Sequence, residues 1–120
     1  MKIVGKALLV GACLLWSASA QAGAQDFQLL NETGYQIDYV YLSAVDEQDW
    51  EEDVMGEDAL PTGEAVDIEF AGGDDRCLWD LKAIYNDGDE AVWGGIDLCR
   101  IARITLYYNS SEARTWAVTE

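Results

Sequence analysis

A dense run of carboxylates is the part of this sequence in which side-chain chemistry could occur. Between Asp46 and Asp58, eight of the 13 residues are acidic. Oxygen ligands of this kind suit calcium, and sites that work outside the cell bind it with dissociation constants of about 10⁻⁴–10⁻³ M. Asp46, Asp49 and Asp53 are therefore the candidate ligands of a divalent cation. The acid spacing of an EF-hand loop is absent from this run, and a solvated acidic surface explains the same residues.

Two other sets of side chains could bind a ligand or act on one. The acidic loops at 72–75 and 87–90 flank a predicted strand at its opposite ends, so they cannot easily share one ion. The four tryptophans beyond residue 24 and the six tyrosines could stack on sugars, or they could fill a small β core. A pair of carboxylates in a cleft, about 5–10 Å apart, could hydrolyse a glycoside. A carboxylate-pair hydrolase is therefore an alternative function.

The composition excludes several classes of function. The chain has 120 residues, with 23 acids, 7 bases, no histidine and a formal net charge of −16. The lack of histidine excludes a Ser-His-Asp triad, a Cys-His nucleophile and a histidine-ligated zinc or haem site. Nucleic acid is an unsuitable partner, because lysine and arginine drive phosphate binding. Residues 25–75 contain 16 acids and no base, which predicts a negative surface that a basic protein or a divalent cation would neutralise.

Residues 1–24 have the three-part order of an export signal: a positive start, an uncharged apolar run of ten residues and a set of small residues. The apolar run is shorter than the about 20 residues of a membrane span. We therefore expect a mature chain, 25–120, that is one acidic domain, has no membrane span and is periplasmic or secreted. Its net charge would be −18, because the removed segment holds two bases and no acid. Cleavage could follow any of three alanines: Ala20, Ala22 or Ala24.

The cysteines agree with export. Cys13 lies within the signal segment, where lipidation is an alternative to simple cleavage. Cys77 and Cys99 remain as an even pair in an exported chain, so we expect them to form a disulfide. That bridge would close a loop of about 23 residues and stabilise the fold by about 3 kcal/mol.

Hydrophobic alternation and turn residues predict an all-β chain, a small antiparallel β-sandwich or barrel of about seven strands. One short helical turn is expected at 47–55, because Trp50 and Val54 are four residues apart, Asp46 can cap the turn and Gly56 can end it. An α+β domain, with a true helix around Trp50, is the alternative. The strands are expected at 27–31, 35–44, 65–70, 77–85, 90–99 with a break or bulge at Gly94-Gly95, 101–108 and 113–119.

Short motifs follow one another in a fairly specific order along the chain: Phe27, Asn31-x-Thr33-Gly34, Ile37, Val40-Tyr41-x-Ser43, Trp50-x-x-Asp53-x-x-Gly56, Leu60-Pro61-x-Gly63, Cys77-x-Trp79-Asp80-Leu81-Lys82 and Leu98-Cys99. This string resembles a group of small exported bacterial proteins of unknown function, some of which carry the name argininosuccinate lyase. That lyase is a much larger helical tetramer, and its acid–base residues have no counterpart here. The resemblance therefore implies export, a β fold and the disulfide, but no reaction. It also marks Asn31, Trp50, Asp53 and Gly56 as either a structural corner or a site.

Together these features predict a non-enzymatic, exported binding or interaction module. Its acidic face would bind a divalent cation, of which calcium is the candidate, or a basic protein. An inhibitor of a cationic enzyme such as a lysozyme is one form of the second alternative. The carboxylate-pair hydrolase is the enzymatic alternative, and it requires a concave pocket.

Overall fold

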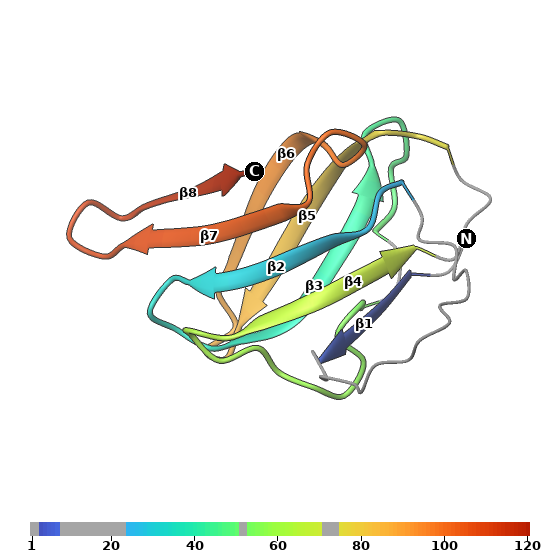
Figure 1. The fold of residues 1–120 in the computed structure, drawn as a ribbon. Coiled ribbons are helices and arrows are strands. Elements are labelled where there is room, and N and C mark those ends of the chain that lie inside the picture. The colour runs from blue at the N-terminus through green and yellow to red at the C-terminus, as the bar shows by residue number, and fades with distance from the viewer. Residues whose placement is uncertain (1–2, 8–23, 51–52, 71–74) are drawn as a thin grey trace.

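The computed structural model describes residues 3–7, 24–50, 53–70 and 75–120. Two β-sheets face each other, and Figure 1 shows the larger sheet lying across the smaller one. The all-β sandwich expected from the sequence is confirmed. The strands are β1 (Ile3–Ala7), β2 (Phe27–Glu32), β3 (Ile37–Ala44), β4 (Ala65–Phe70), β5 (Leu78–Tyr85), β6 (Glu90–Asp97), β7 (Arg103–Asn109) and β8 (Arg114–Thr119).

The two sheets differ in size and in strand direction. The larger has the order β1-β4-β2-β7-β8, and the smaller has the order β3-β5-β6. All pairs are antiparallel except β2 and β7, which run parallel with Leu29 opposite Ile104. This parallel pair brings β2, which begins at Phe27, against a strand that begins more than 70 residues later. The β7–β8 hairpin extends beyond its neighbours at one side of the sandwich (Figure 1).

The period-2 alternation of apolar residues explains which faces are buried. In β4, Val66, Ile68 and Phe70 are buried, while Asp67 and Glu69 alternate with them and are half-exposed. The inward-facing side chains of both sheets form one core, in which the fully buried Trp79 meets Phe70 edge-to-face at 5.1 Å. The buried hydrophobic residues of this core run from Phe27 to Leu106.

The segment expected to form a helical turn at 47–55 contains no helix among its described residues, which corrects that prediction. The segment instead bonds to the edge of β3. Val54 donates its N–H to the Val40 carbonyl at 2.8 Å, and the Val40 N–H donates to Asp53 Oδ1 at 2.9 Å. These bonds to a neighbouring strand replace the i→i−4 bonds that a helix would need. Gly56, with φ at +65°, then turns the chain in the left-handed region that favours glycine.

The irregularity expected at Gly94-Gly95 is present inside β6. The pairing of β5 with β6 shifts register between Trp79 and Leu81, which is the signature of a bulge. The Gly95 N–H donates to Asp80 Oδ1 at 2.9 Å, and a Cβ on Gly94 would lie 3.1 Å from the same oxygen. Asp80 therefore fixes the bulge from the neighbouring strand, and a side chain at position 94 would crowd it.

At the N-terminus, β1 pairs antiparallel with β4 along the outer edge of the larger sheet. Cys13 and the candidate cleavage positions Ala20 and Ala22 lie outside the described residues. None of the described residues belongs to a helix long and apolar enough to span a membrane.

Candidate functional site

A pocket opens at the end of the sandwich where the β5–β6 hairpin turns. Its volume is about 430 Å³. Three connections meet there, namely the β2–β3 turn, the β5–β6 hairpin and the β7–β8 hairpin, and residues from all three line it. Its lining includes three tyrosines, Tyr35, Tyr85 and Tyr108, and three acids, Asp87, Asp89 and Glu90.

The three tyrosine rings form a connected aromatic cluster. The Tyr35 ring meets Tyr85 at 6.4 Å and Tyr108 at 5.8 Å between centroids, both nearly edge-to-face. Such arrangements suit the quadrupoles of aromatic rings. Tyr35 is 47% exposed, so the cluster presents aromatic surface to solvent at the pocket.

The Tyr85 hydroxyl is buried in this cluster, and it has no hydrogen-bond partner among the described residues. The neighbouring hydroxyls of Thr33 and Thr115 donate elsewhere: Thr33 Oγ1 donates to Asn31 Oδ1 at 2.7 Å, and Thr115 Oγ1 donates to the Tyr107 carbonyl at 2.8 Å. Burial raises the pKa of the Tyr85 phenol above its ordinary value of 10.0, and Thr33 and Thr115 oppose that shift. A buried hydroxyl without a partner costs free energy in the folded state.

We expect Tyr85→Phe to raise the free energy of unfolding at neutral pH by about 1 kcal/mol, because it removes that cost. The raised pKa also makes stability depend on alkaline pH. Because the folded-state pKa of Tyr85 is higher than the unfolded value, ionisation of Tyr85 leaves the free energy of unfolding unchanged below pH 10. The free energy of unfolding then falls as the pH rises through the pKa of the folded state. Urea unfolding at neutral and alkaline pH would measure both effects. The matched control is Tyr39→Phe, since Tyr39 is 46% exposed. If Tyr85→Phe and wild type lose stability in parallel above pH 10, this account of Tyr85 is wrong.

The three pocket carboxylates are exposed and lie on one hairpin. Asp87 Oδ1 accepts the Asp89 N–H at 2.9 Å, and Gly88 adopts a φ of +92°, so the Asp-Gly turn positions the acids. None of the ion pairs between described residues includes these carboxylates, because the arginines contact acids elsewhere. The mouth of the pocket therefore carries uncompensated negative charge.

The three candidate ligands of a divalent cation are not brought together. Asp46 Oδ1 accepts from the Arg76 guanidinium at 3.0 Å, and Asp53 Oδ1 accepts two backbone N–H groups at 2.9 and 3.0 Å. Asp49 is exposed. Among the described residues, only Cys77, Asp97 and Cys99 have three potential ligand atoms within 4.8 Å of one another, and both sulfurs belong to a disulfide. Glu51 and Glu52, which belong to the same acidic run, lie outside the described residues.

Arg76 partly neutralises the acidic half of the chain. It is the first base after the acidic stretch 25–75, and its guanidinium contacts Asp46 at 3.0 Å and Glu47 at 2.9 Å. The same group lies 5.5 Å from the Trp79 ring centroid. The second half of the sequence thus supplies a counter-ion to the first, which only the fold reveals.

Asn31 uses its whole side chain inside the fold. The residue is fully buried. Its Nδ2 donates to the carbonyls of Tyr35 and Leu60, both at 2.8 Å, and its Oδ1 accepts from the N–H and hydroxyl of Thr33 at 3.0 and 2.7 Å. An amide side chain has two donors and one acceptor oxygen with two lone pairs. No hydrogen-bonding capacity remains for a ligand, which favours the structural corner over a site at Asn31.

Trp50 contacts a lysine instead of a carboxylate. The Lys82 Nζ lies 5.0 Å from the Trp50 ring centroid and 5.2 Å from that of Tyr41. Both distances fall within the range of cation–π attraction. The chain therefore already holds one ammonium group between two aromatic rings, on the outer face of the smaller sheet.

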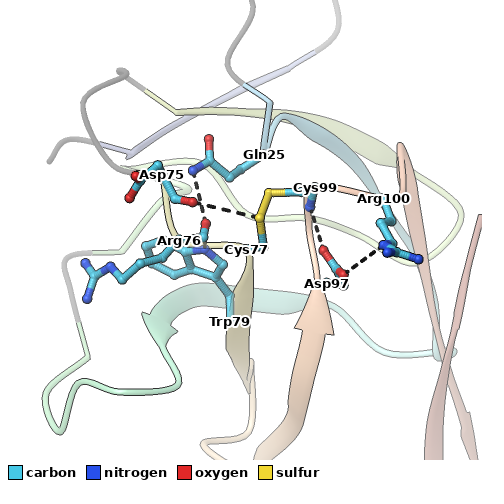
Figure 2. The surroundings of a disulfide bond; sticks show 8 residues. All are labelled: Gln25, Asp75, Arg76, Cys77, Trp79, Asp97, Cys99 and Arg100. Atoms are coloured by element: carbon cyan, nitrogen blue, oxygen red, sulfur yellow. Dashed lines mark hydrogen bonds and ion pairs between the residues drawn. A yellow bond between two sulfur atoms is a disulfide. The ribbon is translucent and has the colours of Figure 1, made fainter.

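The disulfide expected between Cys77 and Cys99 is present, and Figure 2 shows its surroundings. Cys77 precedes β5 and Cys99 follows β6, so the bridge lies at the opposite end of that hairpin from the pocket. The Cys99 N–H donates to Asp97 Oδ1 at 3.1 Å, and the Gln25 side chain donates to the Arg76 carbonyl at 3.1 Å (Figure 2). These bonds connect Cys99 to Asp97 at the end of β6, and the backbone next to Cys77 to Gln25, which precedes β2.

Sequence reasoning identified the 87–90 loop as a hairpin turn and as one of two acidic loops that could bind a ligand, and the tyrosines only as a general aromatic set. It missed that Tyr35, Tyr85 and Tyr108 meet at that loop. Tyr85 could be assigned to a strand face from its alternation. The meeting of three connections separated by up to 73 residues leaves no local signal in the sequence.

Comparison with known proteins leaves the family open and supports the fold. No family model matches the chain, and no curated protein matches it. A solved structure described as "NMR structure of the protein from Eubacterium rectale" is similar over 84% of this chain and 94% of that one, with a TM-score of 0.55 and 13% identity. At this identity the likeness concerns the fold alone.

Proposed function

We propose that this chain is an exported, non-enzymatic binding module, and that its pocket takes a cationic side chain of a basic protein. One observation carries the proposal: three tyrosines line a pocket of about 430 Å³ whose mouth holds three uncompensated carboxylates. Carboxylates attract a cation over distance, and aromatic faces bind it at contact. A lysine or arginine side chain has both the charge and the apolar stem that such a pocket accommodates.

Four further features support export and a basic partner. The disulfide is compatible with an oxidising compartment, and residues 1–24 have the order of an export signal. The motif string resembles a group of small exported proteins. A net charge of −18 on residues 25–120 would steer a basic protein toward this chain and speed its capture. Inhibition of a cationic enzyme such as a lysozyme is one form that this function could take.

The enzymatic alternative has less support. A glycoside hydrolase needs a carboxylic acid held in an apolar environment beside a second carboxylate. Asp87, Asp89 and Glu90 are all exposed. Binding is therefore the chemistry that this pocket suits best.

The test is a triple variant, Asp87→Asn, Asp89→Asn and Glu90→Gln, titrated with a lysozyme as a cationic probe. We expect wild type to bind, and its affinity to fall about tenfold between low and physiological salt, because exposed charges are screened. The triple variant should lose at least about tenfold in affinity at low salt, about 1.4 kcal/mol. Calorimetry would measure both affinities, and the tyrosine resonances of the pocket would report where the probe binds.

A second triple variant separates the pocket from general charge. Glu57→Gln, Asp58→Asn and Glu64→Gln remove the same charge from exposed residues outside the pocket. We expect this control to lower the affinity much less than the pocket variant does. Equal losses in the two variants would show that net charge alone binds the probe. Unchanged pocket resonances on binding would contradict the proposed site.

A further inference from the structure

The outer edge of β4 is the second feature that points to a partner. In the whole chain this edge is covered, because β1 pairs antiparallel with five consecutive residues of β4, from Val66 to Phe70. β1 belongs to the segment with the order of an export signal. Its removal would leave β4 as an edge strand with unpaired backbone groups, and such an edge is a ready template for another strand.

We propose that, once residues 1–24 are removed, the β4 edge binds an extended, alternately apolar and basic segment of a partner chain as an added strand. The proposal rests on the export part of the proposed function and not on the tyrosine pocket. It describes β-augmentation, in which backbone hydrogen bonds supply affinity and alternate side chains supply specificity.

Hydrogen bonds to β2 identify the groups that the edge offers. The Phe70 N–H donates to Asp26 Oδ1 at 2.7 Å, and the Glu64 carbonyl accepts from Asn31 N–H at 3.0 Å. Both bonds lie on the β2 side of β4. Because successive residues of a strand direct their backbone groups to opposite sides, Asp67 and Glu69 direct theirs toward β1. These two residues would offer their N–H and C=O groups to the added strand.

The chemistry of the partner follows from the two faces of β4. On the core face, Val66, Ile68 and Phe70 are at most 5% exposed, so the added strand needs apolar residues opposite them. On the outer face, Asp67 and Glu69 of β4 are acidic, and with Asp26 they line a shallow hollow of about 350 Å³ that extends over β2. Opposite charges across a strand pair are stabilising, so the partner needs basic residues at these positions.

The chain's own β1 shows part of this pattern, because it places a lysine opposite one of the two acids and a valine, Val4, opposite the other, Glu69. In the β1–β4 pairing, Lys6 stands opposite Asp67, and Ile3 stands opposite Phe70. A second copy of β4 is a poor occupant, because antiparallel pairing would place carboxylates of Asp67 and Glu69 from two chains beside one another. The edge therefore favours a basic strand over self-association.

Amide hydrogen exchange on residues 1–120 and on residues 25–120 is the first part of the test. The buried core runs from Phe27 to Leu106 and the disulfide joins Cys77 to Cys99, so the interior lies within 25–120. We expect the Asp67 and Glu69 amides to exchange at least about tenfold faster in the shorter chain. The Phe70 amide, which bonds toward β2, should change little. Equal exchange of the Asp67 and Glu69 amides in both chains would overturn the proposal.

The second part adds a strand in trans, namely a capped peptide of residues 2–8, at millimolar concentration to chain 25–120. We expect this peptide to slow exchange of the Asp67 and Glu69 amides at least about threefold. The Lys6→Glu version of the peptide should not slow this exchange in wild type. It should slow the exchange in the Asp67→Lys variant, because the two substitutions together exchange the charges of the pair. The proposal would be overturned if the peptide protected neither amide. It would also be overturned if protection did not depend on the charges at peptide position 6 and residue 67. Because Asp67 is outside the tyrosine pocket, Asp67→Lys should still bind a cationic probe there, which separates the two hypotheses.

Discussion

Replacing Asn31 with alanine is expected to lower the free energy of unfolding by about 4 kcal/mol, because four hydrogen bonds contribute about 1 kcal/mol each. The side chain is fully buried, so water cannot replace the lost partners. The substitution would leave the carbonyls of Tyr35 and Leu60 without their Nδ2 donor. These two groups belong to the β2–β3 turn and to the segment before β4, so the corner that joins the two sheets should loosen. Urea unfolding at neutral pH would measure the change.

Asn109→Ala is the matched control for this experiment. Asn109 Oδ1 accepts from the Ser111 N–H, the Ser111 hydroxyl and the Glu112 N–H, all in an exposed turn. Because solvent can replace these bonds, we expect a loss of about 1 kcal/mol. Similar losses at the two positions would contradict the role assigned to Asn31 in the buried corner. If Asn31 instead served a ligand, its substitution would change binding of the cationic probe with little change in stability.

Removing the disulfide with Cys77→Ser and Cys99→Ser is expected to lower the free energy of unfolding by about 3 kcal/mol. The bridge spans 22 positions, and its loss frees the corresponding loop in the unfolded chain. For a domain of this size the midpoint of thermal unfolding should fall by about 12–24 °C. Thermal melts followed by circular dichroism, with and without a reducing agent, would measure the shift.

The single variants provide the control for the disulfide. Cys77→Ser alone and Cys99→Ser alone each break the same bond, so each should show nearly the full effect of the double variant. A reducing agent should destabilise wild type and leave all three variants unchanged. If each single variant lost only part of the stability, and the two losses summed to that of the double variant, the crosslink would not be the source of stability. Such additivity would indicate that each thiol packs independently.

The disulfide and the tyrosine pocket lie at opposite ends of the β5–β6 hairpin. The disulfide lies before β5 and after β6, whereas Tyr85 and the three carboxylates lie at the turn. We therefore expect the oxidised and reduced forms, where both are folded, to bind a cationic probe with similar affinity. The disulfide would then act to stabilise the fold in an oxidising compartment.

Local patterns in the sequence were enough to locate seven of the eight strands, from β2 to β8, whereas β1 lies in the segment expected to be an export signal and was not predicted. The alternation of Val66, Ile68 and Phe70 with acids predicted β4 with its observed bounds, and Asp87-Gly88 predicted the turn between β5 and β6. These signals are local because a strand repeats every two residues and a tight turn needs particular backbone angles at one or two positions. The disulfide was predictable for a similar reason, since only two cysteines remain beyond residue 24.

The segment around Trp50 shows where local patterns failed. The spacing of Trp50 and Val54 suited a helical turn, but Val54 and Asp53 bond to Val40 in β3 instead. Bonds to a strand 13–14 residues away compete with local helical bonds, and tertiary packing decides the outcome. The same segment contained the candidate calcium ligands, and Asp46 and Asp53 took partners within the fold.

The sequence by itself determined the class of this protein: an acidic β domain with a disulfide, with seven of its eight strands and most of its turns in place. Only the tertiary structure decided that β2 runs parallel to β7, that Arg76 contacts the acids of the first half, and that three tyrosines meet beside three carboxylates. The physical reason is the range of the interactions. Alternation and turn chemistry act over a few residues, whereas strand order brings together side chains that are tens of residues apart, and that order depends on how the whole core packs.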